Sequence, residues 1–157
     1  MSHRVLSERR ITSDDPAETR DLAARLAAVA RPGDLLCLRG ELGAGKTQFA
    51  KGFGAGLGVT ETINSPSFVL MAEYSGRLPL FHIDLYRLAD ASDAFTGGVI
   101  DERQGAGVTL VEWPERMHDV LPTARLDVLI DGAGDDQRTI SLQPRDLAYQ
   151  RYLEAAS

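Results

Sequence analysis

With 157 residues, of which 43% are hydrophobic and 25% charged, the chain has the size and composition of one globular domain with a single core. No run approaches the roughly 20 apolar residues that cross a bilayer, and the N-terminus lacks an apolar signal core, so we expect one domain over residues 1–157, in the cytoplasm and without a membrane partner. The net charge of −6 and the scattered arginines argue against strong independent binding of nucleic acid, and the single cysteine excludes a disulfide framework.

The first elements predicted along the chain are a strand and a helix. Residues 5–11 have moderate strand character. Asp15, Pro16 and Glu18 then supply an N-cap, a first-turn proline and a capping-box acid. A helix is expected to follow and to end at residues 32–33, with an inner stripe at Thr19, Leu22, Leu26 and Val29 or Ala30.

Residues 40–47 fill every fixed position of the phosphate-binding loop pattern G-x-x-x-x-G-K-[ST]. An apolar run at residues 35–38 precedes the loop and indicates a buried strand. A helix is predicted after the loop, because apolar residues recur there at helical spacing at Phe49, Phe53 and Leu57. Three glycines weaken this helix and would allow close backbone packing, although the sequence gives no firm reason for them: Gly52, Gly54 and Gly56.

The chemistry of this loop points to a nucleoside triphosphate. Glycines let backbone N–H groups turn toward an anion, and the following helix offers the positive end of its dipole. Lys46 would reach the β- and γ-phosphates, and the hydroxyl of Thr47 can bind Mg²⁺, which takes few protein oxygens.

The second half of the chain alternates apolar runs with turns. The predicted elements are a hairpin of residues 68–74 and 78–84, a short helix at 90–95, a buried strand at 108–112, a second hairpin of 126–131 and 139–142, and a terminal helix at about 145–155. The order of elements predicts an α/β fold, the three-layer sandwich of P-loop NTPases, with a mainly parallel central sheet and antiparallel edge strands.

Two of these strands run apolar residues into a carboxylate, ending at Asp84 and Glu112. A nucleotide hydrolase needs an acid at the end of a strand near the phosphate loop, where it holds the metal or its waters. Either acid could also be an ordinary residue at a strand end. Period-two alternation places His82 and Tyr86 on the same face as Asp84, and we interpret His82 as a hydrogen-bonded structural residue rather than a base.

Four motifs, in this order, resemble those of the bacterial TsaE (YjeE) ATPases. They are the loop at residues 40–47, Asn-Ser-Pro-Ser-Phe at 64–68, His-Ile-Asp-Leu-Tyr-Arg-Leu at 82–88 and Val-Glu-Trp-Pro-Glu at 111–115. The resemblance covers nearly the full length and implies an ATPase, with ATP and Mg²⁺ as cofactors, that supports threonylcarbamoyl modification of adenosine 37 in tRNAs. It implies as partners a threonylcarbamoyltransferase subunit and its paralogous partner subunit, of the TsaD and TsaB types, with tRNA reached only through their complex.

Carried over by position, the resemblance implies a set of site residues. The ATP phosphates would be held by Leu42, Gly43, Ala44, Gly45, Lys46 and Thr47. Thr47 and Glu112 would hold Mg²⁺, and Asp84 would support the metal water or the attacking water. The switch residues would be Ser65, Pro66, Ser67 and Trp113, and the nucleotide base or ribose would lie near Asp15 and Arg138.

The chain departs from the family at two places. Ser67 stands where the family usually has threonine, and this change retains a hydroxyl. Residues 94–98 stand where the family usually has an acidic helix, so the resemblance does not extend to that partner-facing surface.

Two other functions stay open on the sequence. A small-molecule kinase shares the loop, the metal and the size, but it needs an arginine-bearing lid that no segment resembles. A nucleotide-regulated adaptor with negligible hydrolysis would carry the same loop. A GTPase would require a guanine-reading Asn-Lys-x-Asp element, which is absent.

Overall fold

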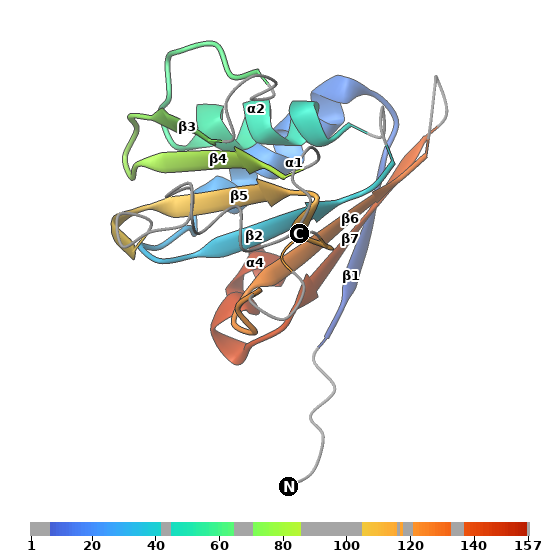
Figure 1. Ribbon diagram of the computed structural model, residues 1–157. Coiled ribbons are helices and arrows are strands. Elements are labelled where there is room, and N and C mark those ends of the chain that lie inside the picture. Colours follow the sequence, from blue (N-terminus) through green and yellow to red (C-terminus); the bar gives the residue numbers. More distant parts are fainter. Residues whose placement is uncertain are drawn as a thin grey trace, which may run out of the picture.

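A mixed seven-stranded sheet forms the centre of the protein, in the strand order β1-β7-β6-β2-β5-β4-β3 (Figure 1). The computed structural model describes residues 7–41, 45–64, 71–85, 105–115, 117, 121–132 and 137–156. Within them the strands are β1 (Arg9–Ser13), β2 (Leu35–Arg39), β3 (Met71–Tyr74), β4 (Leu80–Asp84), β5 (Val108–Glu112), β6 (Leu126–Asp131) and β7 (Arg138–Pro144). The helices are α1 (Pro16–Ala27), α2 (Lys46–Gly56) and α4 (Arg151–Ala155), with one short helical turn at Leu147–Tyr149.

The four central strands β6, β2, β5 and β4 run parallel, whereas β7, β1 and β3 pair antiparallel at the two edges. Every residue of β5 is buried, as expected for a parallel strand covered on both faces. The α/β fold with a mainly parallel central sheet and antiparallel edge strands is therefore confirmed. Among the described residues, no helix is long and apolar enough to cross a bilayer.

Helix α1 begins where its capping signals predict. The side chain of Asp15 accepts a hydrogen bond from the backbone N–H of Glu18 at 2.9 Å, and Pro16 occupies the first turn. Glu18 in turn accepts from the backbone N–H of Asp14, one residue earlier than a standard capping box requires. The predicted inner stripe is buried at Thr19, Leu22, Leu26 and Ala30.

Helices α1 and α2 lie side by side on one side of the sheet (Figure 1), and glycines allow their backbones to touch. A Cβ at Gly52 would lie 2.2 Å from the backbone oxygen of Arg20, and one at Gly56 would lie 2.6 Å from that of Ala24. Both distances are too short for any side chain at these positions. Gly52 and Gly56 thus allow close backbone packing, whereas a Cβ at Gly54 would meet the side chain of Ile63.

The C-terminal segment differs from the predicted helix at residues 145–155. Strand β7 continues to Pro144, and the backbone N–H of Arg145 still donates to the carbonyl of Arg125 at 2.8 Å, which keeps this residue in the sheet. Helix α4 begins only at Arg151, and the Tyr152 hydroxyl donates to the buried carboxylate of Asp34 at 2.5 Å. The first strand also differs, since it spans Arg9–Ser13 rather than residues 5–11. The helix expected at residues 90–95 lies outside the described residues.

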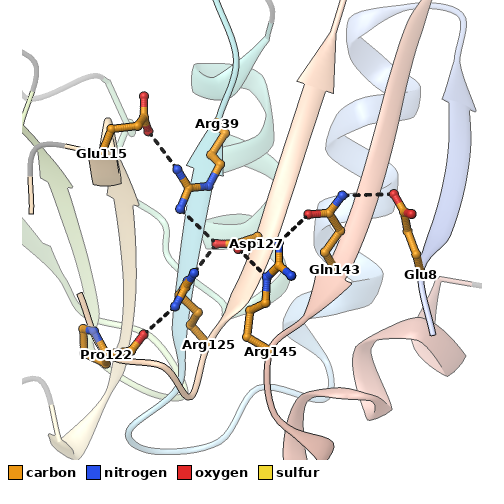
Figure 2. Close-up of polar contacts among 8 residues, drawn as sticks. All are labelled: Glu8, Arg39, Glu115, Pro122, Arg125, Asp127, Gln143 and Arg145. Atoms are coloured by element: carbon orange, nitrogen blue, oxygen red, sulfur yellow. Dashed lines mark hydrogen bonds and ion pairs between the residues drawn. The ribbon is translucent and has the colours of Figure 1, made fainter. Parts of the chain in front are cut away.

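The sheet face opposite α1 and α2 carries a cluster of three arginines around one carboxylate (Figure 2). Asp127, whose side chain is 1% exposed, accepts from Arg145 at 2.8 Å and from Arg125 at 3.0 Å, with Arg39 at 3.5 Å. Burial alone would raise the pKa of Asp127, but the hydrogen bonds from Arg145 and Arg125 and the charge of Arg39 outweigh it and lower that pKa. The cluster therefore ties β2, β6 and β7 together.

Candidate functional site

Three neighbouring parallel strands end together at one edge of the sheet. The strand register pairs Glu112 of β5 with Leu38 of β2 on one side and with Asp84 of β4 on the other. Glu112 and Asp84 are therefore adjacent on the sheet face that α2 covers. The structure confirms that both acids lie at the carboxyl edge, where ligands of α/β sheets bind.

The loop from β2 to α2 uses glycine where the backbone requires it. Gly45 has a φ of 114°, in the left-handed region, and it precedes the first residue of α2 without any side-chain cap. Because glycine has no side chain, the cap residue accepts no hydrogen bond from the backbone N–H groups in the first turn of α2. These N–H groups can therefore donate to a bound anion. Residues Leu42, Gly43 and Ala44 lie outside the described residues.

Lys46 begins α2 with a buried ammonium group. The residue is 5% exposed, and among the described residues Nζ has no hydrogen-bond partner. Nζ lies 4.1 Å from the centroid of the Trp113 ring, a cation–π contact across the site. A buried charge without an acceptor is costly unless a ligand supplies one, so Lys46 fits a bound phosphate.

Trp113 adopts a conformation that bulky residues rarely take. Its φ is 60°, and it is the one described residue other than glycine with a positive φ. It directly follows Glu112 and precedes the buried Pro114. Strain of this kind costs on the order of 1–3 kcal/mol and is concentrated at functional sites. Here it accompanies a turn that carries the indole ring to Lys46.

Glu112 and His82 form a buried pair. His82 Nε2 lies 2.6 Å from Glu112 Oε2, and the two residues are 0% and 4% exposed. The structure confirms that His82 is hydrogen-bonded, as interpreted from the sequence, but its partner was not predicted. The only signal in the sequence was that His82 lies two positions before the end of one apolar run and that Glu112 ends another.

The donor set at this edge fits Mg²⁺. Thr47, in the first turn of α2, and Asp84 are both half-buried and supply oxygens, together with the buried Glu112. Magnesium prefers oxygen ligands, takes one or two carboxylates and keeps several waters. Among the described residues no group of three or more His, Cys, Asp and Glu side chains gathers as a metal cluster.

The remaining predicted residues lie farther along the sheet or outside the described part. Arg138, at the start of β7, pairs in register with Ser13, so it lies beside the segment that leads to Asp15. The Asp15 side chain caps α1. The switch residues Ser65, Pro66 and Ser67 lie outside the described residues. The predicted buried strand position of Cys37 is confirmed, and burial, with a smaller effect of Asp127, raises the pKa of its thiol to about 12.

Known proteins resemble this chain along most of its length. A family model described as "Threonylcarbamoyl adenosine biosynthesis protein TsaE" matches residues 13–140. The "tRNA threonylcarbamoyladenosine biosynthesis protein TsaE" of Bacillus subtilis (strain 168) is 45% identical over 144 residues, 91% of this chain and 90% of that protein. The protein of the same description from Nostoc sp. (strain PCC 7120) is 36% identical over 135 residues, 83% of this chain and 82% of that protein.

A solved structure is similar as well. The crystal structure of Bacillus subtilis YdiB matches with a TM-score of 0.81 and 40% sequence identity, covering 99% of this chain and 97% of that one. The similarity thus extends over the whole sheet and over helix α2.

Proposed function

The chain belongs to the TsaE family of threonylcarbamoyl adenosine biosynthesis proteins, and on that premise we propose that it is a magnesium-dependent ATPase. In this proposal it hydrolyses ATP in association with a threonylcarbamoyltransferase subunit and its paralogous partner subunit, in the cytoplasm. It thereby supports threonylcarbamoyl modification of tRNA position 37 and reaches tRNA only through that complex.

The observation that carries the proposal is the buried ammonium of Lys46. Its Nζ has no hydrogen-bond partner among the described residues. Lys46 is the first residue of α2 and the lysine of a complete phosphate-loop motif. The β- and γ-phosphates would supply the missing acceptors through charge-assisted hydrogen bonds. A bare turn without ligand would leave the cost of the buried charge without compensation.

The side chains at the sheet edge would have separate roles in binding the metal and in orienting water. Thr47 and Glu112 would hold Mg²⁺, which when bound neutralises charge on the phosphates. Asp84, beside Glu112 in the register, would orient a water through hydrogen bonds. Backbone N–H groups of residues 42–47 would surround the phosphates, the region of Asp15 and Arg138 would contact the base or ribose, and Ser65, Pro66, Ser67 and Trp113 would respond to the γ-phosphate.

Glu112 is assigned to the metal because its side chain is longer than that of Asp84 and can reach farther across the sheet edge toward Thr47. The two carboxylates cannot both be the principal ligand without crowding the waters of Mg²⁺. Glu112→Gln should therefore lower the affinity for Mg·ATP. Asp84→Asn should leave that affinity nearly intact and suppress hydrolysis. The reverse pattern would exchange the two assignments.

The decisive experiment measures ATP hydrolysis by the purified protein with and without the transferase complex, beside tRNA modification by the same mixture. We expect slow hydrolysis by the protein alone, faster hydrolysis with the complex, and modification that depends on both. Binding of ATP without hydrolysis under either condition would refute the ATPase proposal and favour a nucleotide-regulated adaptor. Phosphoryl transfer to a small molecule would favour a kinase.

A further inference from the structure

We infer that His82 is a positioning residue, which holds the Glu112 carboxylate in the orientation that Mg²⁺ requires. The inference rests on the proposed function, in which Glu112 is a metal ligand. It assigns a role to a residue that would itself touch neither the metal nor ATP.

The contact is short and shielded from water. Nε2 of His82 lies 2.6 Å from Oε2 of Glu112, slightly below the range of about 2.7–2.9 Å that is usual for charge-assisted N–H···O hydrogen bonds. His82 pairs in register with Leu110, two residues before Glu112 on the same face of β5, so the two side chains meet diagonally across adjacent strands. The strands are fixed by the sheet, and this contact therefore restricts the Glu112 side chain.

The partners of the ring indicate which nitrogen carries the proton. Among the described residues His82 Nδ1 is buried without a hydrogen-bond partner. A proton on Nδ1 would bury an unsatisfied N–H donor, whereas a proton on Nε2 is donated to Glu112 and leaves Nδ1 as a bare acceptor. The arrangement thus favours the tautomer in which Nε2 donates to the Glu112 carboxylate.

This assignment leaves Glu112 suited to a cation. One oxygen, Oε2, is held by His82, which leaves Oε1 as the oxygen that His82 does not bind. Hydrogen-bond partners that orient a metal ligand typically contribute about 10- to 100-fold in metal affinity or activity. Without the His82 donor, Glu112 would lose the contact that restricts its side chain.

Two substitutions at His82 separate positioning from simple packing. His82→Gln retains an N–H donor at nearly the reach of Nε2, whereas His82→Leu fills similar space without a donor. The matched control is Thr109→Val on β5, an isosteric change of a buried residue near the other end of that strand and on the opposite sheet face. Each protein is titrated with Mg²⁺ at fixed ATP, with ATP alone, and in thermal unfolding.

We expect His82→Leu to raise the Mg²⁺ concentration for half-maximal ATP binding by about 10- to 100-fold, with metal-free ATP binding unchanged. His82→Gln should restore most of the wild-type Mg²⁺ dependence, and Thr109→Val should keep it. An equal Mg²⁺ shift in the Leu and Gln variants, or a loss of melting temperature in His82→Leu without any Mg²⁺ shift, would overturn the inference.

A measurement on the unmodified protein tests the inference even if both variants fail to fold. Long-range ¹H–¹⁵N NMR of the labelled His82 ring should find the proton on Nε2, and a proton on Nδ1 would overturn the assignment. Failure of the proposed function would look different, because wild-type protein would then either show no Mg²⁺-dependent ATP binding or bind Mg·ATP without hydrolysing it.

Discussion

Replacing Lys46 with methionine should stabilise the protein while removing most of its affinity for ATP. Methionine retains an unbranched side chain of similar length, which can pack against Trp113, but it carries no charge. The substitution therefore removes a buried ammonium that has no hydrogen-bond acceptor among the described residues. Stability and function are expected to move in opposite directions, as happens when a binding site retains a group that only its ligand satisfies.

The magnitude follows from two opposing contributions. A buried unsatisfied polar group costs about 1–3 kcal/mol, and more when it is charged, whereas the cation–π contact with Trp113 returns up to about 2 kcal/mol. We take the net gain of Lys46→Met as about 1–2 kcal/mol, which for a domain of this size raises the melting temperature by about 2–8 °C. Loss of a charged donor to phosphate should weaken ATP binding by about 1.5–3 kcal/mol, or roughly ten- to 150-fold.

The assay combines thermal unfolding of the ATP-free protein with a direct titration of ATP. Lys51→Met is the matched control, because Lys51 is the only other lysine of the chain, lies on the same helix and is half-buried. The control should change stability by less than about 0.5 kcal/mol and retain ATP binding. A lower melting temperature for Lys46→Met than for wild type, or wild-type ATP affinity, would refute the reasoning.

Three further substitutions test the metal, the arginine cluster and the helix packing. Thr47→Ala should weaken ATP binding only when Mg²⁺ is present, and an equal loss without metal would contradict its role as a ligand. Asp127→Asn should cost about 2–4 kcal/mol at neutral pH, because it leaves the arginines without their buried carboxylate. The lowered pKa of Asp127 means that its ionised form stabilises the fold above about pH 4, so in urea unfolding the difference from wild type should shrink as the pH falls below that value, and a constant difference would contradict the assignment. Gly52→Ala should destabilise by about 1–3 kcal/mol, whereas Gly105→Ala, where a Cβ meets nothing within 4 Å, should not.

The elements best predicted from the sequence were those whose burial and end signals agree. Strands β5 and β6 begin and end at the predicted residues, because central strands are apolar runs bounded by turns or carboxylates. The start of helix α1 was predicted from Asp15, Pro16 and Glu18, and the Asp15 side chain caps it as expected, but the helix ends at Ala27 rather than at residues 32–33. Each of these signals lies within a few residues of the element that it defines.

Predictions were wrong where a distant contact decides the local conformation. Residues 145–155 have a helical composition, yet Arg145 stays in the sheet because its backbone pairs with Arg125 and its guanidinium bonds to Asp127. The first strand is an edge strand with mostly exposed residues, so its apolar pattern was too weak to fix its start. Neither the contact of Arg145 with Arg125 nor the pairing of β1 with β7 could be inferred from neighbouring residues alone.

The site residues were predicted as types but not as pairs. The phosphate-loop motif and the two strand-end acids indicated Lys46, Asp84 and Glu112 individually. The partners found for Lys46 and Glu112 are Trp113 and His82, which only the strand order β2-β5-β4 brings beside them. Three of the arginines that are scattered in the sequence likewise gather around Asp127 once β2, β6 and β7 become neighbours.

Packing and binding are coupled through α2, whose first residue is Lys46. Gly52 lies six residues along this helix, about 9 Å from Lys46 at 1.5 Å per residue, and holds it against the backbone of α1. A methyl group at Gly52 has to displace α2 from α1, and a rigid helix transmits that displacement to its start. Gly52→Ala should therefore lose stability and ATP affinity together, whereas Lys46→Met should gain the first and lose the second. The contrast distinguishes Gly52, which positions α2 and with it the binding site, from Lys46, whose buried charge finds its hydrogen-bond acceptors only in the bound ligand.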